Sequence, residues 1–198
     1  MVGSAMGINP IEIAGNWDKG YVLDTHVLKS VPKGENVYGY MEFDTTRTEL
    51  GELIFLFKNR NRYECLDGIM GLVEPFLDTW EDLKDVDIVL PVPPTKQRNY
   101  QPAAEIARAI SEHLNVSYFD GVLEKTNAEQ AKNVTSTDER QTGSIVARVR
   151  ATRPHTILLV DDLLRTGGTM QQCVSVLRDD PKLEKIFVLA MTKAKGEL

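Results

Sequence analysis

The sequence predicts an α/β fold in which a mostly parallel, twisted sheet is flanked by helices. Three short apolar runs have the length and composition of strands that are buried on both faces. Helical patterns lie between these runs, and strands that alternate with helices favour parallel pairing. The expected strands span residues 86–92, 157–160 and 185–191, and the expected helices span residues 103–114 and 170–177.

The N-terminal part of the chain predicts a hairpin followed by two helices. Residues 21–27 and 37–43 alternate loosely between apolar and polar side chains, and the turn residues 32–36 lie between them. Residues 46–49, Thr-Arg-Thr-Glu, have the spacing of a capping box, which opens a helix. A second helix is expected over residues 65–80.

These patterns divide the chain into regions. Residues 1–7 have the composition of an expression scar. Residues 8–84 are expected to form N-terminal strands and a helical hood, and residues 85–198 the α/β core. Within the core, residues 124–141 show no buried pattern and are long for a connection in a compact domain. That length favours a flexible lid, and an ordinary solvated loop fits the same residues nearly as well.

The strand expected at residues 157–160 leads directly into two carboxylates and a glycine turn. Asp161 and Asp162 are followed by two leucines and by Arg-Thr-Gly-Gly-Thr at residues 165–169. The turn directs backbone N–H groups, hydroxyls and the positive end of the next helix toward an anion, and glycines allow a close approach. The carboxylates would repel a phosphate, so they suit hydroxyl donors such as a ribose diol, or a cation carried by the ligand. Together these residues predict a site for a phosphorylated sugar.

A second loop after a buried strand has the composition of an anion site. Residues 93–101 follow the strand expected at 86–92 and precede a helix that opens at Pro102, where proline is tolerated. The loop carries Lys96, Arg98 and hydroxyl groups, which suit phosphate oxygens. Basic loops are usually just solvated, so this loop alone is a weak indication.

An acid pair at the end of an α/β strand also has other interpretations. The simplest is a solvated pair without a ligand, and receiver-like phosphotransfer domains carry acids at the same place. A receiver needs a phosphorylatable aspartate on a central strand and a lysine after a late strand, for which Lys193 is available. The glycine turn has no role in a receiver, which favours the sugar-phosphate site.

The complete order of features resembles the phosphoribosyl pyrophosphate (PRPP) motif of type I phosphoribosyltransferases, most closely in their ComF-like branch. The resemblance covers roughly residues 46–193. Arg165 departs from the family pattern, which has a small or hydroxylated residue there, and the cysteine zinc module of many such proteins is absent. Besides the acid-pair motif, the matching stretches are Leu53–Lys58, Pro91–Pro93 with Arg98 and Tyr100–Gln101, Ala104–Ala107, and Lys125–Thr126 with Gln130 and Arg140.

The resemblance implies pentosyl transfer, in which a nitrogen nucleophile, a base or ammonia, displaces pyrophosphate from PRPP carrying Mg²⁺. Mg²⁺ would reach the protein through PRPP, without a direct protein ligand. The implied catalytic residues are Asp161, Asp162 and Arg98. The implied PRPP-binding residues are Asp161, Asp162, Leu163, Leu164, Arg165, Thr166, Gly167, Gly168 and Thr169. The implied pyrophosphate-binding residues are Pro94, Thr95, Lys96 and Arg98, and the implied lid residues are Lys125, Gln130, Lys132 and Arg140.

The resemblance leaves one alternative to an enzyme, a non-catalytic regulatory or competence-related ComF-like protein that binds PRPP or a nucleotide. In either case it implies a homodimer with a role in nucleotide metabolism. The acceptor has no readable motif in the sequence.

Composition limits the classes of partner. The formal net charge of −6 argues against broad binding to nucleic acid or to a membrane surface. The two cysteines, Cys65 and Cys173, are far apart and fit free thiols in a reducing compartment, so a cytoplasmic protein is expected. No apolar stretch reaches the length of a membrane span.

Overall fold

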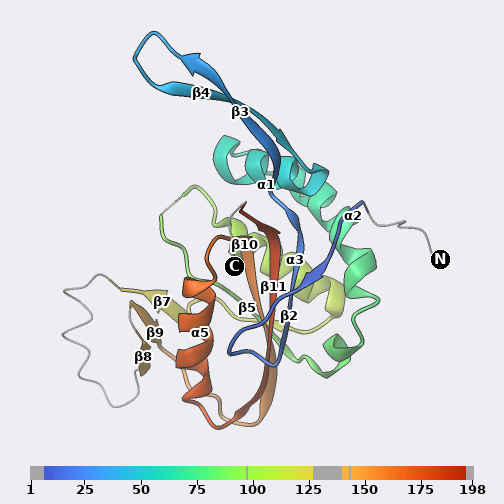
Figure 1. Cartoon of the computed structure of the whole chain (residues 1–198). Coiled ribbons are helices and arrows are strands. Elements are labelled where there is room, and N and C mark those ends of the chain that lie inside the picture. Colours follow the sequence, from blue (N-terminus) through green and yellow to red (C-terminus); the bar gives the residue numbers. More distant parts are fainter. Residues whose placement is uncertain (1–6, 97, 127–139, 143, 195–198) are drawn as a thin grey trace.

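A six-stranded sheet forms the centre of the computed structural model, which describes residues 7–96, 98–126, 140–142 and 144–194 (Figure 1). Only the edge strand β1 runs antiparallel to its neighbour; the other neighbours are parallel. The predicted α/β class with a mostly parallel sheet is therefore confirmed. In spatial order the strands are β1 (Ile11–Glu12), β2 (Lys19–Thr25), β11 (Leu183–Lys193), β10 (His155–Leu164), β5 (Ile88–Pro91) and β6 (Ser117–Tyr118).

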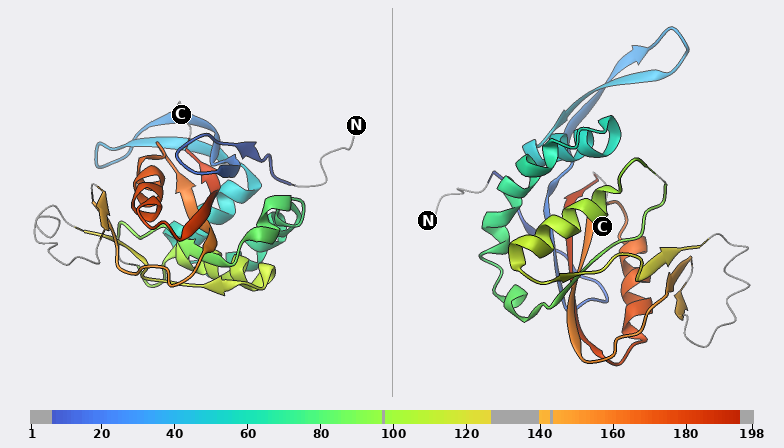
Figure 2. Two further views of the ribbon diagram at one scale, coloured as in Figure 1. Left: turned by 90° about the horizontal axis from the view of Figure 1, so that it is seen from below. Right: turned by 180° about the vertical axis from the view of Figure 1, so that it is seen from behind.

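Helices cover both faces of this sheet (Figure 2). Three of them, together with the short 3-10 helix η1 (Glu81–Asp85), share one apolar cluster with one face of the sheet, and α5 shares another cluster with the opposite face. The layers therefore follow helix, sheet, helix, which buries the central strands on both sides. The helices are α1 (Glu49–Arg60), α2 (Cys65–Leu77), α3 (Pro102–Leu114) and α5 (Gly168–Arg178).

Strand β10 shows why a short apolar run identifies the centre of the sheet. Successive side chains of a strand point to opposite faces. Leu158 and Val160 belong to the cluster under α1, α2 and α3, whereas Ile157 and Leu159 belong to the cluster under α5. All four side chains are at most 1% exposed. A strand with two buried faces must be apolar at every position, and that pattern is visible in the sequence.

The N-terminal hairpin exists, but its predicted strand pairing is wrong. Strand β2 does not pair with residues 37–43; it lies in the main sheet, parallel to β11 and antiparallel to β1. The hairpin consists instead of β3 (Val27–Glu35) and β4 (Met41–Arg47). Its turn lies at residues 36–40, later than expected, where the Asn36 N–H donates to the Tyr40 carbonyl. The physical reason is burial, because Val22 and Leu23 are fully buried in the sheet, which an isolated hairpin cannot provide.

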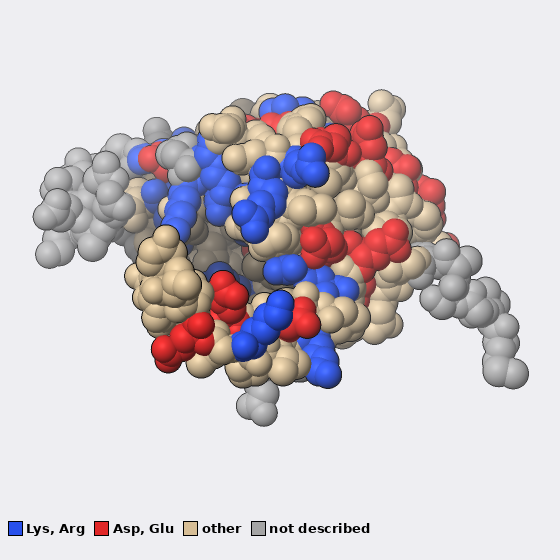
Figure 3. Space-filling model, turned by 90° about the horizontal axis from the view of Figure 1, so that it is seen from above, with Lys and Arg blue, Asp and Glu red and all other residues tan. Residues whose placement is uncertain are grey.

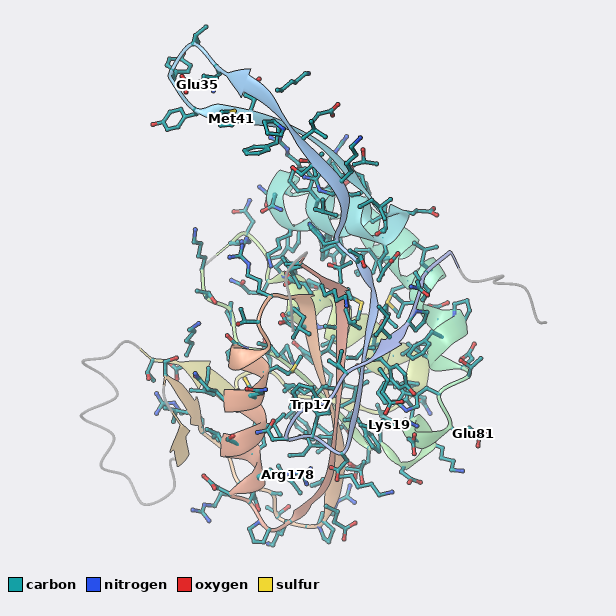
Figure 4. The ribbon with its side chains drawn as sticks, in the orientation of Figure 1. Trp17, Lys19, Glu35, Met41, Glu81 and Arg178 are labelled. Carbon is teal, nitrogen blue, oxygen red and sulfur yellow. The ribbon has the colours of Figure 1, made fainter. Side chains whose placement is uncertain are left out.

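The β3–β4 hairpin extends away from the rest of the molecule (Figure 1). Glu35 and Met41 lie near its tip, far from Trp17, Lys19 and Arg178 at the other end of the sheet (Figure 4). Polar contacts tie that other end together: Arg178 donates to Asp18 at 2.6 Å, and Lys19 donates to Asp82 at 2.8 Å. The hairpin and these contacts therefore mark opposite ends of the molecule.

Two helix boundaries in the N-terminal region differ from the expected ones. The hydroxyl that caps α1 belongs to Thr48, which accepts the Gly51 N–H at 3.0 Å, so the helix starts at Glu49. Helix α2 ends at Leu77 instead of Trp80. Helix ends depend on such local contacts, which periodicity alone does not locate.

A small antiparallel sheet lies beside α5 and contains both ends of the expected lid. Its strands are β7 (Leu123–Lys125), β9 (Ile145–Ala147) and β8 (Arg140–Thr142), with β9 in the middle. Residues 127–139 of the expected lid lie outside the described residues. Within the described part of the chain, no helix is long and apolar enough to cross a membrane.

Candidate functional site

A cavity of about 680 Å³ opens at the carboxyl ends of β5 and β10. Strand β6 follows β5 in the chain and pairs with one edge of β5, whereas β10 pairs with the other edge. The strand order therefore reverses at this point. Ligands of open α/β sheets bind at such points. Figure 3 looks onto this end of the sheet and shows a hollow with lysine and arginine side chains gathered along its rim.

The cavity brings together the two predicted anion-binding segments. From the loop after β5 it is lined by Pro94, Thr95, Lys96 and Arg98. From the end of β10 and the following turn it is lined by Asp161, Asp162, Leu163, Leu164, Arg165, Thr166, Gly167, Gly168 and Thr169. Segments more than 60 positions apart in the sequence thus face one space, as their positions after parallel strands require.

The acid pair is held in regular strand geometry. Strand β10 does not end at Val160 but continues to Leu164, with Asp161 opposite Ala190 and Leu163 opposite Thr192. The Asp161 carboxylate accepts the backbone N–H of Asp162 at 2.9 Å. The Asp162 carboxylate is 2.7 Å from the Lys58 ammonium and is almost completely buried. Pairing along β11 therefore fixes the backbone of both acids.

The surroundings of Asp161 make it an unusual carboxyl group. Desolvation, helped by the negative charge of Asp162, raises its pKa, while the Lys58 ammonium and backbone N–H groups act in the opposite direction. A carboxyl group with a raised pKa titrates closer to neutral pH than an exposed one. The charge of the acid pair is thus sensitive to pH in a range where most carboxylates are constant.

This raised pKa predicts a specific dependence of stability on pH. The folded protein binds the Asp161 proton more tightly than the unfolded chain, whose Asp pKa is about 3.9. The contribution of this group to stability is therefore complete below that value and is lost as pH rises through the folded pKa. We expect the unfolding free energy of Asp161→Asn to increase relative to that of the wild type as pH rises from 4 to 8. Urea unfolding at several pH values measures this difference, and a constant difference would contradict the raised pKa.

The glycine turn presents the N-terminus of α5 to the cavity. Gly167 has φ = +76°, which turns the chain from β10 into the helix that starts at Gly168. The first helical bond runs from the Gln171 N–H to the Gly167 carbonyl, at 2.9 Å. The N–H groups before Gln171 have no partner within the helix, and Gly168 and Thr169 line the cavity. This geometry suits an anion.

The turn also predicts a difference between two neighbouring glycines. We expect Gly167→Ala to lower the unfolding free energy by about 1–2 kcal/mol, because an L-residue is strained at positive φ. A Cβ atom at Gly167 would meet nothing within 4 Å, so the cost comes from the backbone alone. Gly168→Ala is the matched control, because its φ is not positive and its nearest contact would be an ordinary 3.7 Å from Thr166 Oγ1. Chemical denaturation measures the unfolding free energy of both variants. Equal losses would contradict the interpretation that the positive φ of Gly167 causes the effect.

The expected lid residues are only partly described. Lys125 lies at the end of β7, and its ammonium donates to Thr95 Oγ1 at 3.3 Å, which places it next to the loop after β5. Arg140 lies in β8, and its side chain is outside the described part. Gln130 and Lys132 fall outside the described residues, so their assignment to a lid stays a prediction.

Several cavity residues were not predicted as site residues. Lys58 and Asn59 reach the cavity from the end of α1, Asp120 from the segment after β6, and Gln101 from the start of α3. The sequence signal for Lys58 was its place in the stretch Leu53–Lys58, which matches the family.

Comparison with known proteins identifies a related class. No protein-family model matches the chain. An amidophosphoribosyltransferase from Pasteurella multocida (strain Pm70) is 30% identical over 131 residues, which are 58% of this chain and 24% of the relative. The chain thus spans about a quarter of the length of the curated relative that it matches. The chain is thus similar in sequence to part of a phosphoribosyltransferase, and membership of that family, including its ComF-like branch, stays a prediction.

Solved structures of phosphoribosyltransferases also align with the chain. Adenine phosphoribosyl transferase from Trypanosoma brucei, in complex with AMP, pyrophosphate and ribose-5-phosphate, has a TM-score of 0.49 and 12% identity, over 95% of this chain and 87% of that chain. Orotate phosphoribosyltransferase from Aeropyrum pernix has a TM-score of 0.42 and 15% identity, over 87% of this chain and 77% of that chain.

Proposed function

We propose that the protein is a phosphoribosyltransferase that binds PRPP with Mg²⁺ and displaces pyrophosphate with a nitrogen nucleophile, either a base or ammonia. The observation that carries this proposal is the single cavity in which the acid pair, the glycine turn and the cationic loop after β5 meet. The 30% identity to an amidophosphoribosyltransferase supports the same reaction class. Pentosyl transfer also explains why carboxylates and phosphate-binding groups share one site.

The residues have complementary roles in this reaction. The N–H groups and hydroxyls of the turn at 166–169 would hold the 5-phosphate of PRPP, and Lys96 and Arg98 would hold the diphosphate. Positive charge grows on the ribose as the diphosphate leaves, and the nearby Asp161 carboxylate would stabilise it. The same carboxylate would accept hydrogen bonds from the ribose hydroxyls. Arg165 lines the cavity and would add a cation beside the 5-phosphate.

The cavity fits a magnesium ion that arrives with the substrate. Among the described residues, no group of three or more His, Cys, Asp or Glu side chains could hold a metal ion. Mg²⁺ commonly keeps water and substrate phosphates as ligands, so it needs no protein cage. When bound to PRPP it would neutralise charge on the diphosphate, and Lys96 and Arg98 would hold that diphosphate in place.

The direct test is pyrophosphate release from PRPP and Mg²⁺ in the presence of purine and pyrimidine bases, and of ammonia. We expect release that depends on one of these acceptors, together with PRPP binding in titration calorimetry. PRPP binding without release for any acceptor would favour the regulatory, non-catalytic alternative. Absence of both binding and release would contradict the proposal, and labelling by a small phosphodonor would then favour a receiver. Sedimentation of the protein tests the proposed homodimer.

A further inference from the structure

Helix α1 delivers a lysine to the acid pair from a distant part of the chain. The Lys58 ammonium lies 2.7 Å from Asp162 Oδ1, although the residues are 104 positions apart. The lysine side chain is 22% exposed and the aspartate side chain 8% exposed, so the ion pair is largely withdrawn from water. Lys58 also lines the cavity, together with its neighbour Asn59. The pair therefore belongs to the site as well as to the packing of α1.

The position of Lys58 is fixed by the packing on either side of it. Leu50, Ile54 and Phe57 are fully buried and hold one face of α1 against the core. The Tyr100 hydroxyl donates to the Phe57 carbonyl, which ties the last turn of α1 to the segment before α3. Because the backbone of this turn is anchored, Lys58 loses only side-chain freedom when it pairs with Asp162. A buried carboxylate without such a partner would be costly.

The two acids consequently present different charges to the cavity. Asp162 has an ammonium group in contact, and the two charges largely cancel. The Asp161 carboxylate accepts a backbone N–H, and no ammonium group among the described residues lies in contact with it. The Lys58 ammonium also opposes the rise in the pKa of Asp161, so its positive charge acts on both carboxylates. One negative charge, instead of two, thus faces the ligand space.

We propose that Lys58 is a positioning residue that neutralises Asp162, so that Asp161 alone offers a negative charge to the sugar hydroxyls of an anionic sugar phosphate. This inference rests on the proposed function, because it concerns PRPP as the ligand. Among the described residues, four cationic side chains, Lys58, Lys96, Arg98 and Arg165, and three carboxylates, Asp120, Asp161 and Asp162, line the cavity. Loss of Lys58 would remove the excess of positive charge that a polyanion requires.

Charge-matched variants test this role. Lys58→Met leaves Asp162 unpaired and should weaken PRPP binding about tenfold, since a factor of ten corresponds to about 1.4 kcal/mol of repulsion. The double variant Lys58→Met/Asp162→Asn removes both charges and should recover most of the affinity that Lys58→Met loses. Lys58→Arg keeps the charge and should retain most of the affinity. Arg60→Met, an equal charge change on the exposed side of the same helical turn, is the control and should bind as the wild type does.

Calorimetric titration with PRPP and Mg²⁺ measures these affinities, and thermal unfolding without ligand checks that each variant is folded. A purely structural lysine would change the melting temperature without the recovery of affinity in the double variant. Equal PRPP affinity of Lys58→Met and Arg60→Met, or a double variant as weak as Lys58→Met, would overturn the inference about Lys58 alone. Absence of PRPP binding by the wild type would overturn the proposed function and this inference with it.

Discussion

Replacement of Asp161 by asparagine should lower kcat/KM for pyrophosphate release by about a hundredfold to a thousandfold. The variant keeps the size of the side chain and its ability to accept the Asp162 N–H, but it removes the negative charge. Within the acid pair, Asp161 is the carboxylate without an ammonium group in contact. Its negative charge would act on the reacting ribose, which becomes positive in the transition state. The effect should fall mainly on kcat, because the charge on the ribose develops only as the diphosphate leaves.

Two controls separate this effect from a loss of folding. Asp179→Asn changes an exposed aspartate at the far end of α5 and should leave the rate unchanged. Circular dichroism should show that Asp161→Asn remains folded, because the substitution removes the cost of desolvating a negative charge. The same desolvation raises the pKa of Asp161. A folded Asp161→Asn variant with the rate of the wild type would show that Asp161 does not stabilise the transition state.

The acid pair and the turn could be predicted because their signals are local. Ile157–Val160 are apolar on both faces of a central strand, and the polar residues that follow emerge at the carboxyl end of that strand. The loop with Lys96 and Arg98 also follows a strand of the same type. Parallel strands place their carboxyl ends at one edge of the sheet, so the meeting of both segments in one cavity follows from the order of elements.

Two features could not be predicted because they depend on contacts distant in sequence. Residues 21–25 alternate as a hairpin strand would, and only the available edge of β11 decides that they join the main sheet. Lys58 lies at the polar end of an amphipathic helix, close to the exposed Arg60 and Arg62. Its ion pair with Asp162 depends on the position of α1 over the sheet, which no pattern within the helix specifies.

Packing of α1 also predicts the largest effect on stability. Phe57→Ala should lower the unfolding free energy by about 3–5 kcal/mol, the usual cost of removing a phenylalanine from a core. The Phe57 ring is fully buried and lies 4.7 Å from the Tyr100 ring and 5.8 Å from the Tyr63 ring, measured between centroids. A loss of this size is a large part of the 5–15 kcal/mol that stabilises a typical domain.

Phe43→Ala provides the matched control, because the same substitution falls on a side chain of the β3–β4 hairpin that is 56% exposed. We expect it to change the unfolding free energy by less than about 1 kcal/mol. Urea denaturation of both variants at one temperature measures the difference, and equal losses would contradict the role of Phe57 as the anchor of α1. Since Lys58 follows Phe57 directly, the surviving folded fraction of Phe57→Ala should also bind PRPP more weakly than Phe43→Ala. Loosening the last turn of α1 moves the ammonium away from Asp162 and restores the second negative charge to the cavity.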